Sequence, residues 1–107
     1  MERIYNKLVR DNIPNIIENN KEKPIIRILN DDEYKIELEK KLYEEYEEVI
    51  NSKENRIEEL ADMLEVIKAL GHLENKSLND IIDVANQKNK SRGSFNKKIF
   101  LEKVIED

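Results

Sequence analysis

The sequence contains no cysteine, no tryptophan, and only two glycines and two prolines in 107 residues. Without cysteine there is neither a disulfide framework nor a thiolate metal site, which leaves carboxylates and one histidine as metal ligands. So few glycines and prolines cannot supply the turns of an all-β sandwich. No apolar run approaches the roughly 18 residues of a membrane-spanning helix, and no signal peptide is recognisable at the N-terminus. We therefore expect a soluble, cytoplasmic, mostly α-helical protein without a membrane partner.

Charged residues make up 40% of the chain and apolar residues 38%, which is enough apolar side chain for a helical core. This composition argues against disorder throughout. The net charge of −5 and the pI of about 5.1 argue against general nucleic-acid binding, so no nucleic-acid partner is expected. A length of 107 residues suits a single domain, residues 1–107. Any site must then lie within this domain or between copies of it.

Three segments begin with the signature of a helix start, in which Asn or Ser is followed three residues later by an acid. They predict helices over residues 31–51, 56–73 and 78–91. Short connections between them predict antiparallel neighbours. The three pairs are Asn30 with Glu33, Asn55 with Glu58, and Ser77 with Asp80.

The remaining segments are short. Residues 11–18 predict a helix with Pro14 in its first turn. The apolar run PIIRIL at residues 24–29 is either extended packing or half of a strand pairing. Gly71 either ends the second long helix or lies in its last turn. Gly93 suits a helix end, and residues from Ser94 onward are compatible with a helix or an extended tail.

Several acids occupy unexpected positions on the predicted helices. Glu45 lies within the apolar arc of helix 31–51, and Glu48 borders that arc, whereas Glu44 lies farther outside it. On the next helix, Glu59 and Asp62 lie within the apolar arc. If the two helices pack antiparallel, these arcs direct four carboxylates toward one point. The alternative is a solvated face of a charge-rich helix.

A carboxylate cluster within an apolar arc needs a counter-ion, because burying one unpaired carboxylate costs several kcal/mol. Oxygen-only ligation matches Mg²⁺ or Mn²⁺. A di-iron bundle would require Glu-x-x-His pairs, and the only histidine, His72, follows Ala69 at that spacing. We expect His72 at the surface rather than in a metal site.

The pattern Glu44-Glu45-x-x-Glu48, followed by Glu59-x-x-Asp62 on the next helix, resembles the metal signature of the all-α nucleotide pyrophosphatases. This superfamily includes the MazG-like and phosphoribosyl-ATP pyrophosphohydrolase-like proteins. The opening YNKLVRDNIPNII at residues 5–17 is similar to that of a small branch with a KLVRD-x-IP motif. Further similarity covers residues 23–34 and 88–95, so the resemblance extends over most of the chain.

The resemblance implies an antiparallel helical bundle of the MazG-like type with short accessory segments at both ends. It implies an Mg²⁺-dependent enzyme, with Mn²⁺ as a substitute, that cleaves a nucleoside triphosphate or related nucleotide to a monophosphate and pyrophosphate. The implied metal ligands are Glu45, Glu48, Glu59 and Asp62, and Glu44 occupies the first acidic position of the catalytic motif. It also implies a homodimer or homotetramer.

Release of pyrophosphate requires cations, and four basic residues are candidates for substrate binding: Lys7, Arg10, Lys88 and Arg92. For Lys88 and Arg92, which share one helical face, the alternative role is to complement a helix C-terminus. For Arg10 the alternative is an ion pair with Asp11 or another acid. Tyrosines can stack on a base, or else belong to the core or an interface: Tyr5, Tyr34, Tyr43 and Tyr46.

Three functions are consistent with these features. A house-cleaning nucleotide pyrophosphohydrolase is the main hypothesis, and phosphoribosyl-ATP pyrophosphohydrolase of histidine biosynthesis is a second one with the same chemistry. The third is a non-catalytic helical interaction module. Self-association is also expected from the residues themselves, because a second face of the long helices carries apolar side chains that one small copy cannot bury: Tyr43, Ile50, Ile57 and Leu64.

Overall fold

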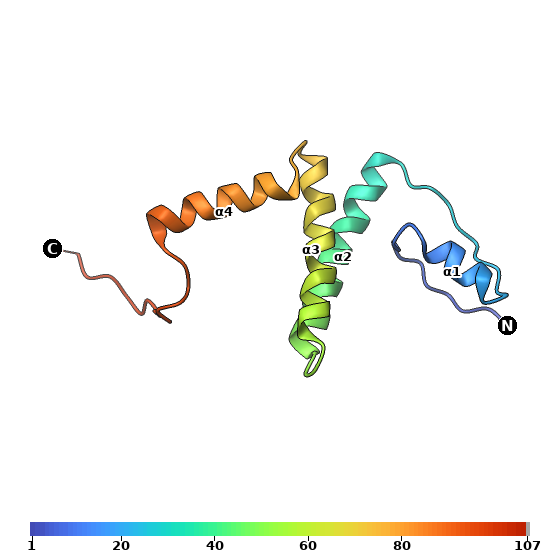
Figure 1. Cartoon of the computed structure of the whole chain (residues 1–107), viewed down its shortest axis with the longest axis horizontal. Helices are drawn as coiled ribbons and strands as arrows, with labels where there is room; N and C mark the ends of the chain where they lie inside the picture. Colours follow the sequence, from blue (N-terminus) through green and yellow to red (C-terminus); the bar gives the residue numbers. More distant parts are fainter. Residues whose placement is uncertain (107) are drawn as a thin grey trace.

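Helices α2 and α3 form an antiparallel hairpin that contains the buried core. The computed structural model describes residues 1–106, and among them there are four helices and no strand. The helices are α1 (Ile13–Asn19), α2 (Asp31–Asn51), α3 (Arg56–Leu73) and α4 (Leu78–Arg92). The short loop 52–55 joins α2 to α3, and the two helices lie side by side (Figure 1). The predicted all-α class is confirmed.

The observed helix bounds agree closely with the predicted ones. Helices α2 and α3 begin and end at the predicted residues, α4 is one residue longer than predicted, and α1 covers Ile13–Asn19 instead of 11–18. Gly71 lies inside the last turn of α3, and Gly93 ends α4 with a φ of 83° that favours glycine. None of the helices in the described part of the chain is both long and apolar enough to cross a lipid bilayer.

Two of the three predicted capping boxes are present. The Asn30 side chain accepts a hydrogen bond from the Glu33 amide at 2.9 Å, and Ser77 Oγ accepts one from the Asp80 amide at 3.1 Å. Each acid in turn accepts a bond from the backbone N–H of its cap residue. The third predicted box is wrong. Asn55, in the tight loop before α3, has φ −109° and ψ 37° instead of the extended backbone of a cap, and its side chain makes no capping bond.

Helix α4 does not pack antiparallel along α3, so this part of the predicted bundle is wrong. It contacts the end of α3 and then leads away from the hairpin (Figure 1). The close approach occurs at Gly71, where a Cβ atom would lie 2.7 Å from Ile81 Cδ1. The apolar residues of α4 are confined to its first half, and residues 86–92 are all polar, so nothing continues the contact.

The core of one copy is small. Only Leu38, Val49 and Val66 are buried apolar residues among those described, at 3%, 7% and 8% exposure. The accessible surface is 10361 Å², whereas a compact monomer of 12.7 kDa would expose about 6,200 Å². The radius of gyration is 18.8 Å, against about 13 Å for a compact chain of this length. A large apolar area is therefore left without a partner.

Candidate functional site

Three acids converge between the two long helices. Glu45 of α2 and Glu59 and Asp62 of α3 each offer a carboxylate oxygen, and these oxygens all lie within 4.8 Å of one another. Helical spacing explains their position, because Glu45 follows Leu38 by seven residues and precedes Val49 by four, on the face turned toward α3. Because α2 and α3 form an antiparallel hairpin (Figure 1), the two helices face each other. The acids of α3 thereby come close to Glu45.

Glu45 is the least exposed of the acids, with 9% of its surface accessible. Burial raises the pKa of its carboxyl above the usual value, and the negative charges of Asp62, Glu44 and Glu59 add to the rise. The Lys41 ammonium, 3.7 Å from the Glu45 carboxylate, acts in the opposite direction. The charged form of Glu45 is therefore held at an energetic cost.

Glu59 is half-buried and has a neighbour in Glu48. Desolvation raises the pKa of Glu59, and Glu48 is the acid that contributes most to the remaining rise. Glu48 is exposed on α2 and lies outside the group of three converging oxygens. Three of the four predicted metal ligands therefore converge, and the fourth, Glu48, lies beside Glu59.

Two cations of the N-terminal segment contact the acidic side of the hairpin. Arg10 donates a hydrogen bond to Asp62 at 2.8 Å, and Lys7 donates one to Glu44 at 3.3 Å. An ion pair with an acid is the alternative to substrate binding that the sequence analysis gives for Arg10, and this pair is present. Both pairs are half-exposed, so neither contributes much to stability, but both place a positive charge beside the carboxylates.

Lys41 is a residue of this site that the sequence analysis missed. Its ammonium lies 3.6 Å from Glu44 and 3.7 Å from Glu45, and its side chain is only 18% exposed. The signal was available, because Lys41 precedes these acids by three and four residues on one helix, the spacing of intrahelical ion pairs. Lys41 reduces the repulsion on α2 without reaching the acids of α3.

The structure does not bring Lys88 and Arg92 to the acids of their own chain. Both lie in the second half of α4, which leads away from the hairpin (Figure 1). Lys90 and Arg92 occupy the last turn of α4, where positive charge complements the helix C-terminus. Of the four predicted cations, Lys7 and Arg10 therefore contact the acids described here within one copy.

The other single residues occupy expected surroundings. His72 is exposed, as predicted. The rings of Tyr43 and Tyr46 lie 6.1 Å apart on α2, and both side chains are about half-exposed or more, at 65% and 48%. Their position is that of a helix surface without a partner in this copy.

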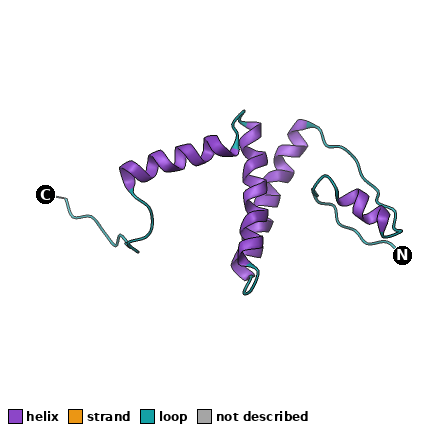
Figure 2. Ribbon diagram, in the orientation of Figure 1, coloured by secondary structure: helices purple, strands orange, loops and turns teal. Residues whose placement is uncertain are grey.

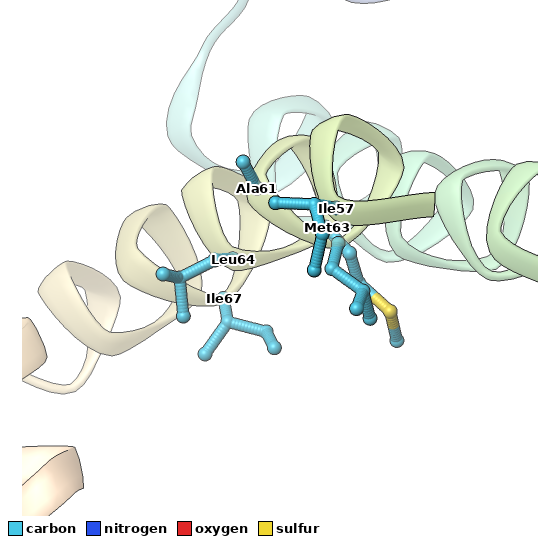
Figure 3. A pocket seen from close by; sticks show the side chains of 6 residues that line it. Ile57, Ala61, Met63, Leu64 and Ile67 are labelled. Atoms are coloured by element: carbon cyan, nitrogen blue, oxygen red, sulfur yellow. The ribbon is translucent and has the colours of Figure 1, made fainter. Parts of the chain in front are cut away.

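A shallow apolar groove lies on the side of α3 that α2 does not cover. Its side chains project from successive turns of α3 (Figure 3). Ile57 is 78% exposed and Leu64 is 45% exposed, in agreement with the predicted second apolar face. The groove is lined by Ile57, Leu60, Ala61, Met63, Leu64 and Ile67.

Comparisons of the chain with protein families, curated proteins and solved structures find no match. The resemblance drawn from the sequence motifs therefore stays a prediction. A function for this chain has to be inferred from its acids and from the cations that surround them.

Proposed function

We propose that this chain is an Mg²⁺-dependent nucleotide pyrophosphohydrolase of the MazG-like type. It would cleave a nucleoside triphosphate or a related nucleotide to a monophosphate and pyrophosphate. The observation that carries the proposal is the convergence of Glu45, Glu59 and Asp62, with oxygens within 4.8 Å of one another, at the seam between α2 and α3. The motif resemblance supplies the reaction class, and the acids supply a place for a hard cation.

The donor set fits a divalent cation. Only carboxylate oxygens converge, and oxygen ligands are those that Mg²⁺ and Mn²⁺ prefer. Burial is the main cause of the raised pKa values of Glu45 and Glu59, and the neighbouring acids add to both. When bound, Mg²⁺ would neutralise phosphate oxygens and orient the reacting groups. In this proposal Glu48, beside Glu59, completes the set of ligands.

The cations of the N-terminal segment would bind the phosphates. Arg10 and Lys7 lie at Asp62 and Glu44, next to the acids that would hold the metal. In the reaction a water oxygen bonds to phosphorus and the water gives up a proton to solvent. The phosphoanhydride P–O bond breaks, and its electron pair leaves with the pyrophosphate as additional negative charge. Arg10 and Lys7 would stabilise that charge. Lys88 and Arg92 would contribute only from the α4 of another copy.

A homodimer or homotetramer is part of the proposal. One copy exposes about 4,000 Å² more surface than a compact monomer of its mass. The apolar groove of α3 is part of this exposed surface. Burial of a second face against another copy would supply the core that Leu38, Val49 and Val66 alone do not.

The decisive experiment is a screen for pyrophosphate release with Mg²⁺. The substrates should be the standard nucleoside triphosphates, a set of modified ones and phosphoribosyl-ATP. Preference for modified nucleotides would support a house-cleaning role, and preference for phosphoribosyl-ATP would support the role in histidine biosynthesis. Turnover should vanish without a divalent cation.

Variants make the screen specific for the site. Asp62→Asn and Glu48→Gln remove ligand charge at nearly constant volume and should abolish turnover while circular dichroism stays that of the wild type. Glu47→Gln is the matched control, because Glu47 is exposed on the same helix and lies outside the converging group. Full activity of Asp62→Asn or Glu48→Gln would remove that residue from the catalytic metal site. No pyrophosphate from any substrate would favour a non-catalytic interaction module instead.

A further inference from the structure

Two extended segments of the chain carry exposed apolar side chains. Segment 24–29 lies between α1 and α2, and segment 99–106 follows a turn at residues 95–98 after α4; both are drawn as loop (Figure 2). In the first segment, Ile25 is 84% exposed and Ile28 is 89% exposed. Five large apolar side chains of the second are 73% to 86% exposed: Ile99, Phe100, Leu101, Val104 and Ile105. Each segment exposes more apolar surface than a short linker requires.

The backbones of both segments also lack partners. Among the described residues, no backbone–backbone hydrogen bond involves residues 24–29 or 99–106. Both stretches are rich in β-branched and aromatic residues. The one proline within them, Pro24, stands at the end of its stretch, where a strand tolerates proline. An extended segment with free N–H and C=O groups is a template for pairing with another strand. Each segment therefore has the properties of one strand of a two-stranded β-ribbon that lacks its partner strand.

The two segments lie at opposite ends of an elongated molecule. The long axis of the chain measures 67 Å, with residues 24–29 on one side of the α2–α3 hairpin and the C-terminal segment on the other (Figure 1). The third extended stretch, at the N-terminus, is tied to distant parts of its own chain by ion pairs of Arg3 with Glu22 and of Arg10 with Asp62. Segment 24–29 has only a local ion pair, of Arg27 with Glu33 in the first turn of α2, among the described residues, and its backbone groups stay without partners. The partner that matches each segment is therefore the other segment, supplied by a second copy.

We propose that residues 100–105 of one copy pair antiparallel with residues 24–29 of a second copy, and the reverse. Antiparallel pairing is slightly more stable per residue than parallel pairing. A register that places Arg27 opposite Glu102 also brings apolar residues opposite one another at three further positions, and only Ile26 then faces a charge, on Lys103. The three apolar pairs are Ile25 with Val104, Ile28 with Leu101, and Leu29 with Phe100. A twofold axis then generates two identical ribbons. This exchange of arms does not depend on the proposed catalytic function.

Disulfide trapping tests the pairing directly, because the chain has no cysteine of its own. Ile28→Cys and Leu101→Cys are made in separate full-length chains, one of which carries a tag that changes its mass. The mixed chains are oxidised and separated on a denaturing gel without reductant. We expect a linked species that contains one chain of each kind, at several times the yield of the control pair Ile25→Cys and Leu101→Cys. Ile25 lies on the opposite face in the proposed register and cannot reach Leu101.

Two further measurements test whether the arms pair between copies. If the double variant with both cysteines in one chain forms a link within that chain instead of between chains, the arm folds back on its own copy and the proposal is wrong. No link above the control level overturns it as well. Sedimentation equilibrium gives independent evidence: Leu101→Asp should raise the dissociation constant at least about tenfold, which corresponds to about 1.4 kcal/mol. Asn96→Asp, outside the ribbon, should not, and an unchanged constant for Leu101→Asp contradicts the proposal.

Discussion

Replacement of Glu45 by glutamine tests whether the three acids are held together at a cost that a cation relieves. The Glu45 carboxylate lies within 4.8 Å of oxygens of Glu59 and Asp62, so two negative charges repel it. Lys41, at 3.7 Å, offsets part of this repulsion. Because Arg10 also partly neutralises Asp62, we expect a net cost of about 1 kcal/mol.

In metal-free protein at neutral pH, Glu45→Gln should therefore raise the melting temperature by about 4–8 °C. Glutamine keeps the shape of the side chain, and Lys41 retains its pair with Glu44 at 3.6 Å. In wild-type protein, saturation with Mg²⁺ at 100 times its dissociation constant should add about 2.7 kcal/mol. The same addition should stabilise Glu45→Gln less, because one ligand charge is missing.

The pH dependence has a defined sign. The folded-state pKa of Glu45 is raised, so the folded protein binds a proton more readily than the unfolded chain does. Metal-free wild type should therefore gain stability as the pH falls from neutral through the folded-state pKa, toward the ordinary value of 4.5, and Glu45→Gln should lose part of this gain.

Differential scanning calorimetry with chelator and then with Mg²⁺ measures these effects, with Glu47→Gln as the control that should change neither. A wild type without an Mg²⁺ shift, together with a lower metal-free melting temperature for Glu45→Gln, would mean that Glu45 is an ordinary structural acid.

Three other predictions concern the cations, the caps and the apolar groove. Arg10→Gln removes a cation that competes for Asp62 and should tighten Mg²⁺ binding several-fold in a calorimetric titration; unchanged affinity would show that Arg10 does not compete. Ser77→Ala should lower the free energy of unfolding by about 1 kcal/mol, because the Ser77 side chain makes a capping bond. Asn55→Ala should lower it by close to nothing, because the Asn55 side chain makes none, and equal losses in thermal unfolding would contradict this. Wild type should sediment as a dimer or larger species at micromolar concentration, and Leu64→Lys should shift it toward monomer.

The helices could be predicted from local sequence because their starts and ends have local causes. Asn30 and Ser77 have capping partners three residues away, and Gly93 provides the positive φ that ends α4. The cap at Asn55 could not be predicted, since the loop between two packed helices decides its backbone angles. The direction of α4 could not be predicted either, because it depends on the close contact of Gly71 with Ile81.

In the candidate site, too, positions set by helical spacing could be predicted from the sequence, whereas contacts between distant residues could not. The apolar arcs alone bring Glu45, Glu59 and Asp62 onto facing surfaces, and the structure brings their oxygens together. The contacts of Arg10 and Lys7 join residues more than thirty positions apart, with no periodicity that would reveal them. Lys41 followed a known spacing and could have been found.

The presence of Glu45 at the seam of the hairpin is not explained by folding. Leu38, Leu42, Glu45 and Val49 follow the spacing of one buried helical face, and Leu38 and Val49 are buried on it. An apolar side chain at position 45 would extend the core, and replacement of buried charges by apolar residues is often neutral or stabilising. On α3, Asp62 stands four residues before the buried Val66 at the edge of the same contact, with its side chain 46% exposed. Burial and the neighbouring acids raise the pKa of Glu45, and Lys41 counteracts the rise only in part. The proposed cation would give these acids a role that the packing of the hairpin does not.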